Sequence, residues 1–169
     1  MMNSNQKLRR VSKFKMKNLL ILGGSGYIGT VLIPNLLKEN YNIIGVMSGT
    51  SLDGIDIVYV HFEKKEKWNY KILNSITYEY SKEWLNKLEN SLNLSEKNLT
   101  KLDQEYTVLL SKQILKFIKE FSIKDIDAVS SHGHTIFHDP QNKYTYQMGN
   151  LPEISKEIEI SFEKEMKQL

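Results

Sequence analysis

The chain has 169 residues, of which 40% are hydrophobic and 25% are charged, and its formal net charge is +3. This profile is typical of a soluble globular protein with one domain, or one domain and a fragment of another. The absence of cysteine excludes a disulfide scaffold, thiolate metal sites and thiol catalysis, and no apolar run approaches the length of about 18 residues that a membrane-spanning helix needs.

The basic charge is concentrated in residues 1–17, which contain six lysines and arginines and no acidic residue. Residues 18–169 therefore hold 17 basic and 20 acidic residues, a net charge of −3. A folded part with this balance is not expected to bind nucleic acid. We expect residues 1–17 to be a disordered leader.

Residues 18–40 predict a Rossmann-like βα fragment, with a strand at 18–22 and a helix at 27–38. Glycines between such elements let the backbone approach a pyrophosphate at the helix N-terminus. The candidate dinucleotide-binding residues are Gly23, Gly26 and Gly29. The segment resembles the opening of an epimerase or dehydratase of the extended short-chain dehydrogenase family. A dinucleotide site also needs an acidic residue about twenty positions further on. The nearest candidate, Asp53, belongs to another motif, so NAD is not expected as a cofactor.

Three strands are expected in the next part of the chain. Apolar runs at 43–47 and 55–62 predict two neighbouring antiparallel strands. The run at 55–62 is apolar on both alternating sets of positions, so the sheet should be covered on both faces. Cleaner alternation at 70–80, after a charged turn at 63–67, predicts the partner strand of a hairpin.

Two helices and a further strand follow. Helical spacing of apolar residues predicts a short helix at 81–92 and a long helix at 99–121, with Asn98 or Thr100 as its N-cap. A short buried strand is expected at 126–130. The order of strand, hairpin, helices and strand indicates an α/β layer fold.

The strongest motif is the string from Ile44 to Asp56, in which a strand runs into a small, hydroxyl-rich turn and out into a second strand. Such a hairpin presents backbone N–H groups and hydroxyls to the phosphates of a nucleotide. Asp53 and Asp56 are candidate ligands for a hydrated Mg²⁺, which binds a few carboxylates and keeps several waters. The candidate ATP-binding residues are Gly49, Thr50, Ser51, Leu52, Asp53, Gly54, Ile55 and Asp56.

Two more motifs follow this turn, one at 131–138 and one at 146–150. Together the three motifs resemble the N-terminal half of the anhydro-N-acetylmuramic acid kinases, from about residue 41 to about residue 155. This family belongs to the sugar kinase, Hsp70 and actin superfamily. The resemblance implies an incomplete ribonuclease H-like α/β lobe, preceded here by the βα extension. It also implies that one segment lines the cleft near the sugar: His132, Gly133, His134 and Thr135.

By this resemblance, the complete enzyme uses ATP and Mg²⁺ to open the 1,6-anhydro ring of the sugar with water and to phosphorylate O6. The activity belongs to cell-wall recycling in the cytoplasm, with an amino sugar and ATP as small-molecule partners and no nucleic acid or membrane. Most members of the family carry Gln where this chain has His134. Whether the protein forms a homodimer is left open by the resemblance.

The boundaries expected from the sequence are a leader at 1–17, a βα fragment at 18–40, a kinase lobe at 41–152 and an amphipathic helical tail at 153–169. No catalytic residue is assigned, because the general-base carboxylate and the second lobe are expected beyond the C-terminus. A fragment of this kind is expected to have little activity alone.

Three alternatives remain open at this stage. One is an NAD(P)-binding module built on the three glycines. Another is a non-catalytic interaction domain that binds a partner through the tail. A zinc site is the third, because His132 and His134 alternate by two and a strand would point both to one side, with His138 nearby.

Overall fold

The computed structural model describes residues 19–22, 40–154, 156 and 158. The predicted strand at 18–22 is confirmed, whereas the leader, the helix expected at 27–38 and the three glycines before and within it lie outside the described residues. The elements run in the order β1 (Leu19–Leu22), β2 (Asn40–Ser48), β3 (Ile55–Lys64), β4 (Trp68–Tyr78), α2 (Lys82–Glu89), η1 (Ser91–Asn93), α3 (Glu96–Glu120), β5 (Ala128–Asp139) and β6 (Tyr144–Met148).

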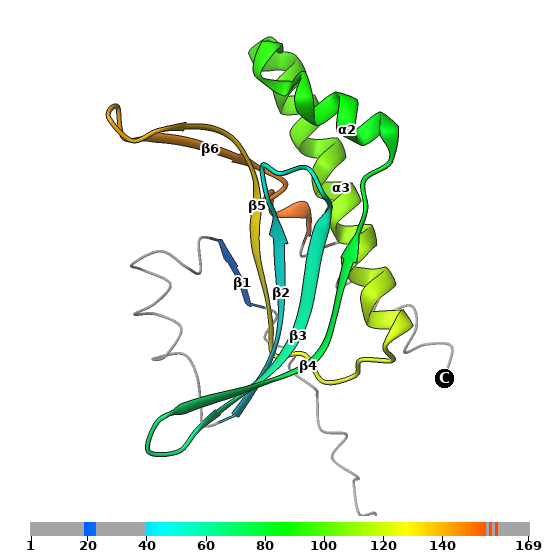
Figure 1. Ribbon diagram of the computed structural model, residues 1–169, viewed down its shortest axis with the longest axis vertical. Coiled ribbons are helices and arrows are strands. Elements are labelled where there is room, and N and C mark those ends of the chain that lie inside the picture. The colour runs from blue at the N-terminus through cyan, green and yellow to red at the C-terminus, as the bar shows by residue number, and fades with distance from the viewer. Residues whose placement is uncertain (1–18, 23–39, 155, 157, 159–169) are drawn as a thin grey trace, which may run out of the picture.

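The strands form one mixed sheet, in the order β1-β5-β2-β3-β4 with β6 paired to β5 (Figure 1). β2, β3 and β4 are an antiparallel meander, and β5 lies parallel to β2 on its other side. Parallel strands need a long crossover, which α2 and α3 supply between β4 and β5. The predicted antiparallel pair is confirmed, with Ile43 opposite Val60 and Met47 opposite Asp56.

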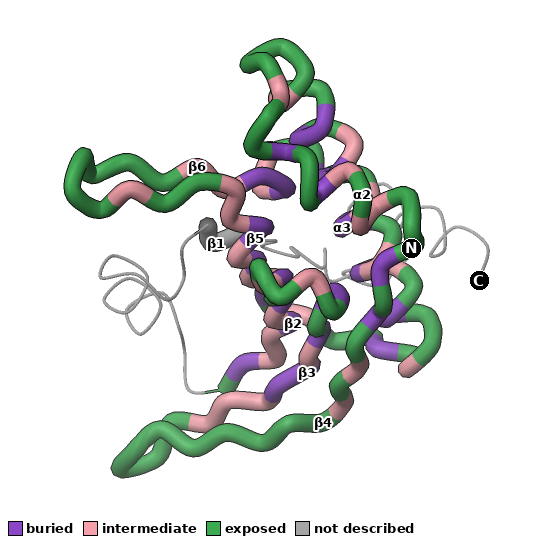
Figure 2. Tube along the Cα trace, turned by 45° about the horizontal axis from the view of Figure 1, so that its top comes forward, coloured by how far each residue is buried: buried purple, intermediate pink, exposed green. Residues whose placement is uncertain are grey.

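The core lies between the sheet and α3. Alternate residues of the strands and the apolar stripe of α3 are buried together, including Ile44, Val46, Ile55, Ile57, Tyr106, Leu110, Ile114 and Phe117. Buried residues of α2 and of the start of the tail join the same cluster. The described helices therefore cover one face of the sheet, while the β3–β4 and β5–β6 hairpins extend outward as exposed arms (Figure 2).

The start of α3 corrects the expected capping. The helix begins at Glu96, with Ser95 at the N-cap position in an extended conformation, so Asn98 and Thr100 lie inside the first turns. An acidic residue in the first turn complements the helix dipole and favours this earlier start. The Thr100 hydroxyl instead donates to the Glu96 carbonyl at 3.0 Å.

The last strand and the tail also differ from expectation. The strand expected at 126–130 runs to Asp139, because β6 folds back and pairs with its second half. Residues 153, 154, 156 and 158 are helical, and Ile154 and Ile158 are buried; the rest of the predicted tail lies outside the described residues. Among the helices that the structure describes, none is both long enough and apolar enough to cross a membrane.

Candidate functional site

The hydroxyl-rich turn joins β2 to β3. It lies at the end of the sheet towards which the parallel strands β2 and β5 both run. Ser48 and Ile55 pair across its base, and the Leu52 N–H donates to the Gly49 carbonyl at 3.3 Å. Leu52 has a φ of 59°, a left-handed conformation that tightens the turn. Thr50, Ser51 and Asp53 are exposed, so the turn is open to solvent at the end of the sheet.

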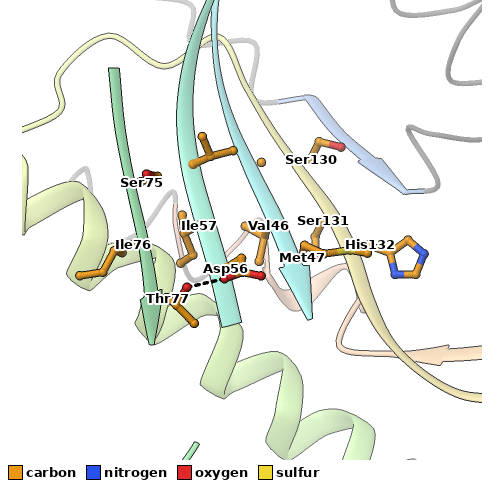
Figure 3. Close-up of a pocket in the computed structure, with 12 residues that line it drawn as sticks. Val46, Met47, Asp56, Ile57, Ser75, Ile76, Thr77, Ser130, Ser131 and His132 are labelled. Carbon is orange, nitrogen blue, oxygen red and sulfur yellow. Dashed lines mark hydrogen bonds between the residues drawn. The ribbon is translucent and has the colours of Figure 1, made fainter. Parts of the chain in front are cut away.

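The two carboxylates of the turn are each held by a neighbouring hydroxyl. The Ser51 hydroxyl donates to Asp53 Oδ1 at 2.8 Å, and the Thr77 hydroxyl of β4 donates to Asp56 Oδ1 at 2.5 Å (Figure 3). Both acids are exposed. Each bond uses one oxygen, and none of the residues that the structure describes donates a hydrogen bond to the other carboxylate oxygen, which could accept a cation or a further donor.

Gly54 is required by a close approach between strands. A Cβ at this position would lie 2.6 Å from the Tyr78 carbonyl oxygen. The backbone of β3 can therefore meet the end of β4 only because residue 54 has no side chain. This contact fixes the end of the turn and therefore the position of Asp56, the second residue of β3.

The two histidines of the β5 motif lie in different surroundings. His134 is 3% exposed and its ring packs 5.8 Å from that of Tyr106, in the core. His132 is half-buried and borders a hollow on the opposite face of the sheet (Figure 3). The expectation that both point to one side is wrong, because Gly133 has a φ of 69° and breaks the alternation of the strand.

A metal site on these histidines finds no support. His138 lies on the exposed β5–β6 hairpin, where its Nδ1 atom is 2.9 Å from the Thr145 hydroxyl. The part of the chain that the structure describes contains no group of three or more His, Cys, Asp or Glu side chains placed to hold a metal ion. The zinc alternative for His132, His134 and His138 is therefore not carried further.

A buried hydrogen-bond network holds the residue that precedes the turn. The Tyr106 hydroxyl donates to Ser48 Oγ at 2.7 Å and bonds the Tyr80 hydroxyl at 2.5 Å. Ser48 Oγ also lies 3.3 Å from the Gly133 carbonyl and 3.4 Å from His134 Nδ1. Burial raises the pKa of both tyrosines, so both phenols stay protonated at neutral pH and can donate. Burial, together with nearby His132, lowers the pKa of His134 and keeps its ring neutral.

The motif at 146–150 packs against β5 and α3. Gln147 Nε2 lies 3.1 Å from His132 Nε2 and 3.3 Å from the Thr135 hydroxyl, to which it donates. The Asn150 side-chain amide donates to the His132 carbonyl at 3.0 Å. The structure thus brings the second and third motifs together at the same end of the sheet as the turn.

Two glycines allow this packing. A Cβ on Gly133 would collide with the side chain of Asn150 and the carbonyl of Met148, and a Cβ on Gly149 would lie 2.6 Å from the Tyr106 ring. Gly149 has a φ of 88°, which favours glycine. Its N–H donates to the Asp103 carboxylate at 2.6 Å, so α3 holds this motif directly.

Several supporting residues were missed at the sequence level. Tyr106 was assigned to the core stripe, which gives its burial but not the bond of its hydroxyl to Ser48. Asp103 receives hydrogen bonds from Gly149 and from the Tyr146 hydroxyl, the latter at 2.9 Å. An acid three residues before Tyr106 on the apolar side of a long helix was a usable signal, because buried acids are rare unless paired.

Comparison with known proteins finds one matching family model and several similar proteins. The model of the family "Anhydro-N-acetylmuramic acid kinase" matches residues 41–167. A protein of that name from Sulfurimonas denitrificans is 32% identical over 131 residues, which is 74% of this chain and 35% of the relative. Those from Sulfurovum sp. and Haemophilus influenzae are 34% and 30% identical over 117 and 132 residues. The chain spans about a third of the length of these relatives: 35%, 31% and 33%.

Proposed function

The chain belongs to the anhydro-N-acetylmuramic acid kinase family, and from this premise we propose that its described part is the phosphate-binding lobe of an ATP-dependent kinase for anhydro-N-acetylmuramic acid. In the proposed reaction of the whole enzyme, water adds across the 1,6-anhydro bond of the sugar. The γ-phosphoryl group of ATP passes to O6, and ADP leaves.

The observation that carries this proposal is the exposed turn at 49–54, fixed at both ends. Ser48 is held in the core by Tyr106, and Asp56 is held by Thr77 on β4. Between these two anchors Thr50 and Ser51 are exposed, and the Ser51 hydroxyl donates to Asp53. A preorganised set of donors binds phosphate without first having to be ordered.

The residues of the turn fit a nucleotide with its metal. Asp53 and Asp56 would hold a hydrated Mg²⁺, since each has one carboxylate oxygen without a hydroxyl donor and each is exposed. When bound, Mg²⁺ neutralises charge on the phosphates of ATP. The Thr50 hydroxyl would donate to a phosphate oxygen, while the Ser51 hydroxyl holds Asp53 towards the metal.

The β5 motif would face the sugar through His132, Thr135 and Gln147, whose polar atoms meet in one half-buried cluster. His134 has a different task in this proposal. Its ring is buried against Tyr106 and lies next to Ser48, so it supports the turn instead of contacting the substrate. We assign no general base to the described residues.

Binding of a fluorescent ATP analogue with Mg²⁺ tests the proposal. We expect saturable binding that Asp56→Asn weakens by about tenfold or more, because a charge-assisted contact contributes roughly 1.5 kcal/mol or more. Glu63→Gln is the matched control, since Glu63 is an acid of the same strand at the far end from the turn. The control should bind like the unaltered chain. Absence of binding, or equal weakening by both variants, would contradict the turn assignment.

A coupled assay of ADP release with the anhydro sugar tests the extent of the activity. Phosphoryl transfer needs metal, phosphates and nucleophile to be positioned together. We therefore expect this chain to bind nucleotide and to turn over far more slowly than a complete sugar kinase. Turnover at the level of a complete enzyme would show that the chain carries a full active site.

A further inference from the structure

Strand β4 lies at an edge of the sheet. It pairs with β3 on one side, and no other strand that the structure describes pairs with it on the other. Residues 68–73, in the half of β4 nearer the tip of the β3–β4 hairpin, are all exposed (Figure 2). Proteins usually protect such an edge with charges, proline or a cover. Trp68–Tyr78 contains one charged residue, Lys71, and no proline, so the edge is open to a further strand.

A bulge sets the length of this edge. The register between β3 and β4 shifts between Tyr59 and Val60, and Leu73 is the extra residue of β4 at that point. A bulge bends its strand and increases the local twist. The regular part of the exposed edge is therefore residues 68–72, which extend beyond the core as one side of the arm.

The side chains of this segment alternate between two faces. Trp68, Tyr70 and Ile72 share one face, and the two polar residues between them share the other. The apolar three are 39%, 71% and 54% exposed. The Tyr70 ring lies 6.3 Å from the ring of Phe62 on β3, so the apolar face continues across the arm. A contiguous exposed apolar surface of this kind marks an interaction site.

The segment complements its own copy. In a two-fold antiparallel pairing, one residue lies opposite itself and the others pair symmetrically about it. With the axis at Tyr70, Trp68 lies opposite Ile72 of the second copy. Asn69 then lies opposite Lys71 of the second copy. Apolar side chains thus meet apolar side chains on one face, and the polar residues meet on the other.

Charge selects this register over its neighbours. An axis at Lys71 would place two lysines opposite each other, and an axis at Asn69 would place Lys71 opposite Lys67 of the second copy. Like charges directly opposite each other destabilise a strand pair. An axis at Ile72 would draw the bulged Leu73 into the pairing. The register centred one residue before Lys71 avoids all three conflicts.

The size of the contact indicates a weak, reversible dimer. A fully covered aromatic side chain buries roughly 150 to 250 Å², and Trp68 and Tyr70 are already partly covered within one chain. A five-residue edge with three such side chains therefore falls in the class below about 1,200 Å², which is typical of transient contacts.

We propose that two copies of this chain associate by antiparallel pairing of residues 68–72 about a two-fold axis at Tyr70, so that the two β3–β4 arms form one four-stranded ribbon. The arm lies at the end of β3 away from the turn at 49–54. The proposal is therefore independent of nucleotide binding, because no residue of the turn enters the argument.

Sedimentation of the full chain over a concentration series tests the association. We expect the average mass to rise from one chain towards two between about 5 μM and about 500 μM, the range of a weak contact. Tyr70→Lys places like charges at the axis and should move the midpoint to a concentration at least about tenfold higher. Tyr144→Lys is the matched control on the other arm, where Tyr144 is 52% exposed, and should associate like the unaltered chain.

Disulfide trapping tests the register, since the sequence has no cysteine of its own. Residues directly opposite in an antiparallel pair have Cα atoms about 4.5 to 5.5 Å apart, within the range of a disulfide. Tyr70→Cys should therefore be trapped as a dimer under mild oxidation. The rate should be at least about tenfold that of Asn69→Cys, whose copy lies about 6.8 Å further along the strand. Tyr144→Cys reports the rate of chance collisions.

The other outcomes overturn the proposal. A mass that stays at one chain throughout the series would show that the edge remains unpaired. Association that Tyr70→Lys and Tyr144→Lys weaken equally, or that neither weakens, would place the contact elsewhere on the molecule. Equal trapping at positions 69, 70 and 144 would show that the chains meet without the proposed register.

Discussion

Substitution of Tyr106 by Phe is expected to destabilise the lobe through one hydroxyl. Tyr106 is fully buried, and its hydroxyl bonds Ser48 Oγ at 2.7 Å and the Tyr80 hydroxyl at 2.5 Å. Phe keeps the ring and its packing, so the change isolates these two bonds. Ser48 keeps acceptors at Gly133 and His134, whereas the Tyr80 hydroxyl, on a side chain 9% exposed, loses the acceptor that the structure gives it.

The magnitude follows from that asymmetry. A lost buried hydrogen bond costs about 1 kcal/mol, and a buried hydroxyl left without a partner costs about 1 to 3 kcal/mol. We therefore expect Tyr106→Phe to lower the free energy of unfolding by about 2 to 4 kcal/mol, a large share of the roughly 5 to 15 kcal/mol that stabilises a typical domain.

Urea denaturation followed by circular dichroism measures this loss. Tyr144→Phe is the matched control, because Tyr144 is 52% exposed on the β5–β6 arm, and exposed substitutions usually change stability by less than about 0.5 kcal/mol. If both variants unfold at the same urea concentration, the Tyr106 hydroxyl does not hold Ser48 in the way that its distances indicate.

Two further predictions concern the same core. Gly149→Ala should lower the free energy of unfolding by at least about 2 kcal/mol in urea denaturation. The added Cβ would lie 2.6 Å from Tyr106 and 2.7 Å from Leu110, and the φ of 88° is unfavourable for alanine. Gly45→Ala is the control and should destabilise the protein less, because the nearest atom to its added Cβ would be 3.1 Å away. His134→Gln should flatten the pH dependence of stability in acid. Burial lowers the folded-state pKa of His134 below the ordinary histidine value of 6.5, so the stabilisation from the neutral ring is complete above that pH and is lost as the pH falls. An equally steep loss in the variant would show that His134 is not the group responsible.

The sequence predicted those elements whose signal is local. The strand pair around the turn follows from two apolar runs and a hydroxyl-rich link, and the stripe of α3 follows from helical spacing. The length of β5 could not be predicted in this way, because residues 135–139 lie beyond its pairing with β2 and extend as a strand through their pairing with β6. That pairing depends on contacts between distant residues, which periodicity does not report.

The surroundings of the site depend on single backbone angles and single hydroxyls. Strict alternation places His132 and His134 on one side, but the φ of 69° at Gly133 separates them, and nothing in the sequence fixes a glycine to positive φ. Similarly, the stripe of α3 indicates that Tyr106 is buried but not that its hydroxyl reaches Ser48. A family resemblance located the motifs, while the structure alone identifies what supports them.

One helix connects the parts of the site that lie far apart in the sequence. Tyr106 of α3 bonds Ser48 at the base of the turn, and Asp103, one turn earlier on the same helix, bonds the Gly149 N–H. The turn and the motif at 146–150 are therefore both held in place by α3. A change that moves α3 must shift both motifs together, whereas a change confined to the exposed turn leaves the β5 and β6 contacts intact. The buried face of α3 thus determines the geometry of the site, although no residue of that face is exposed to a ligand.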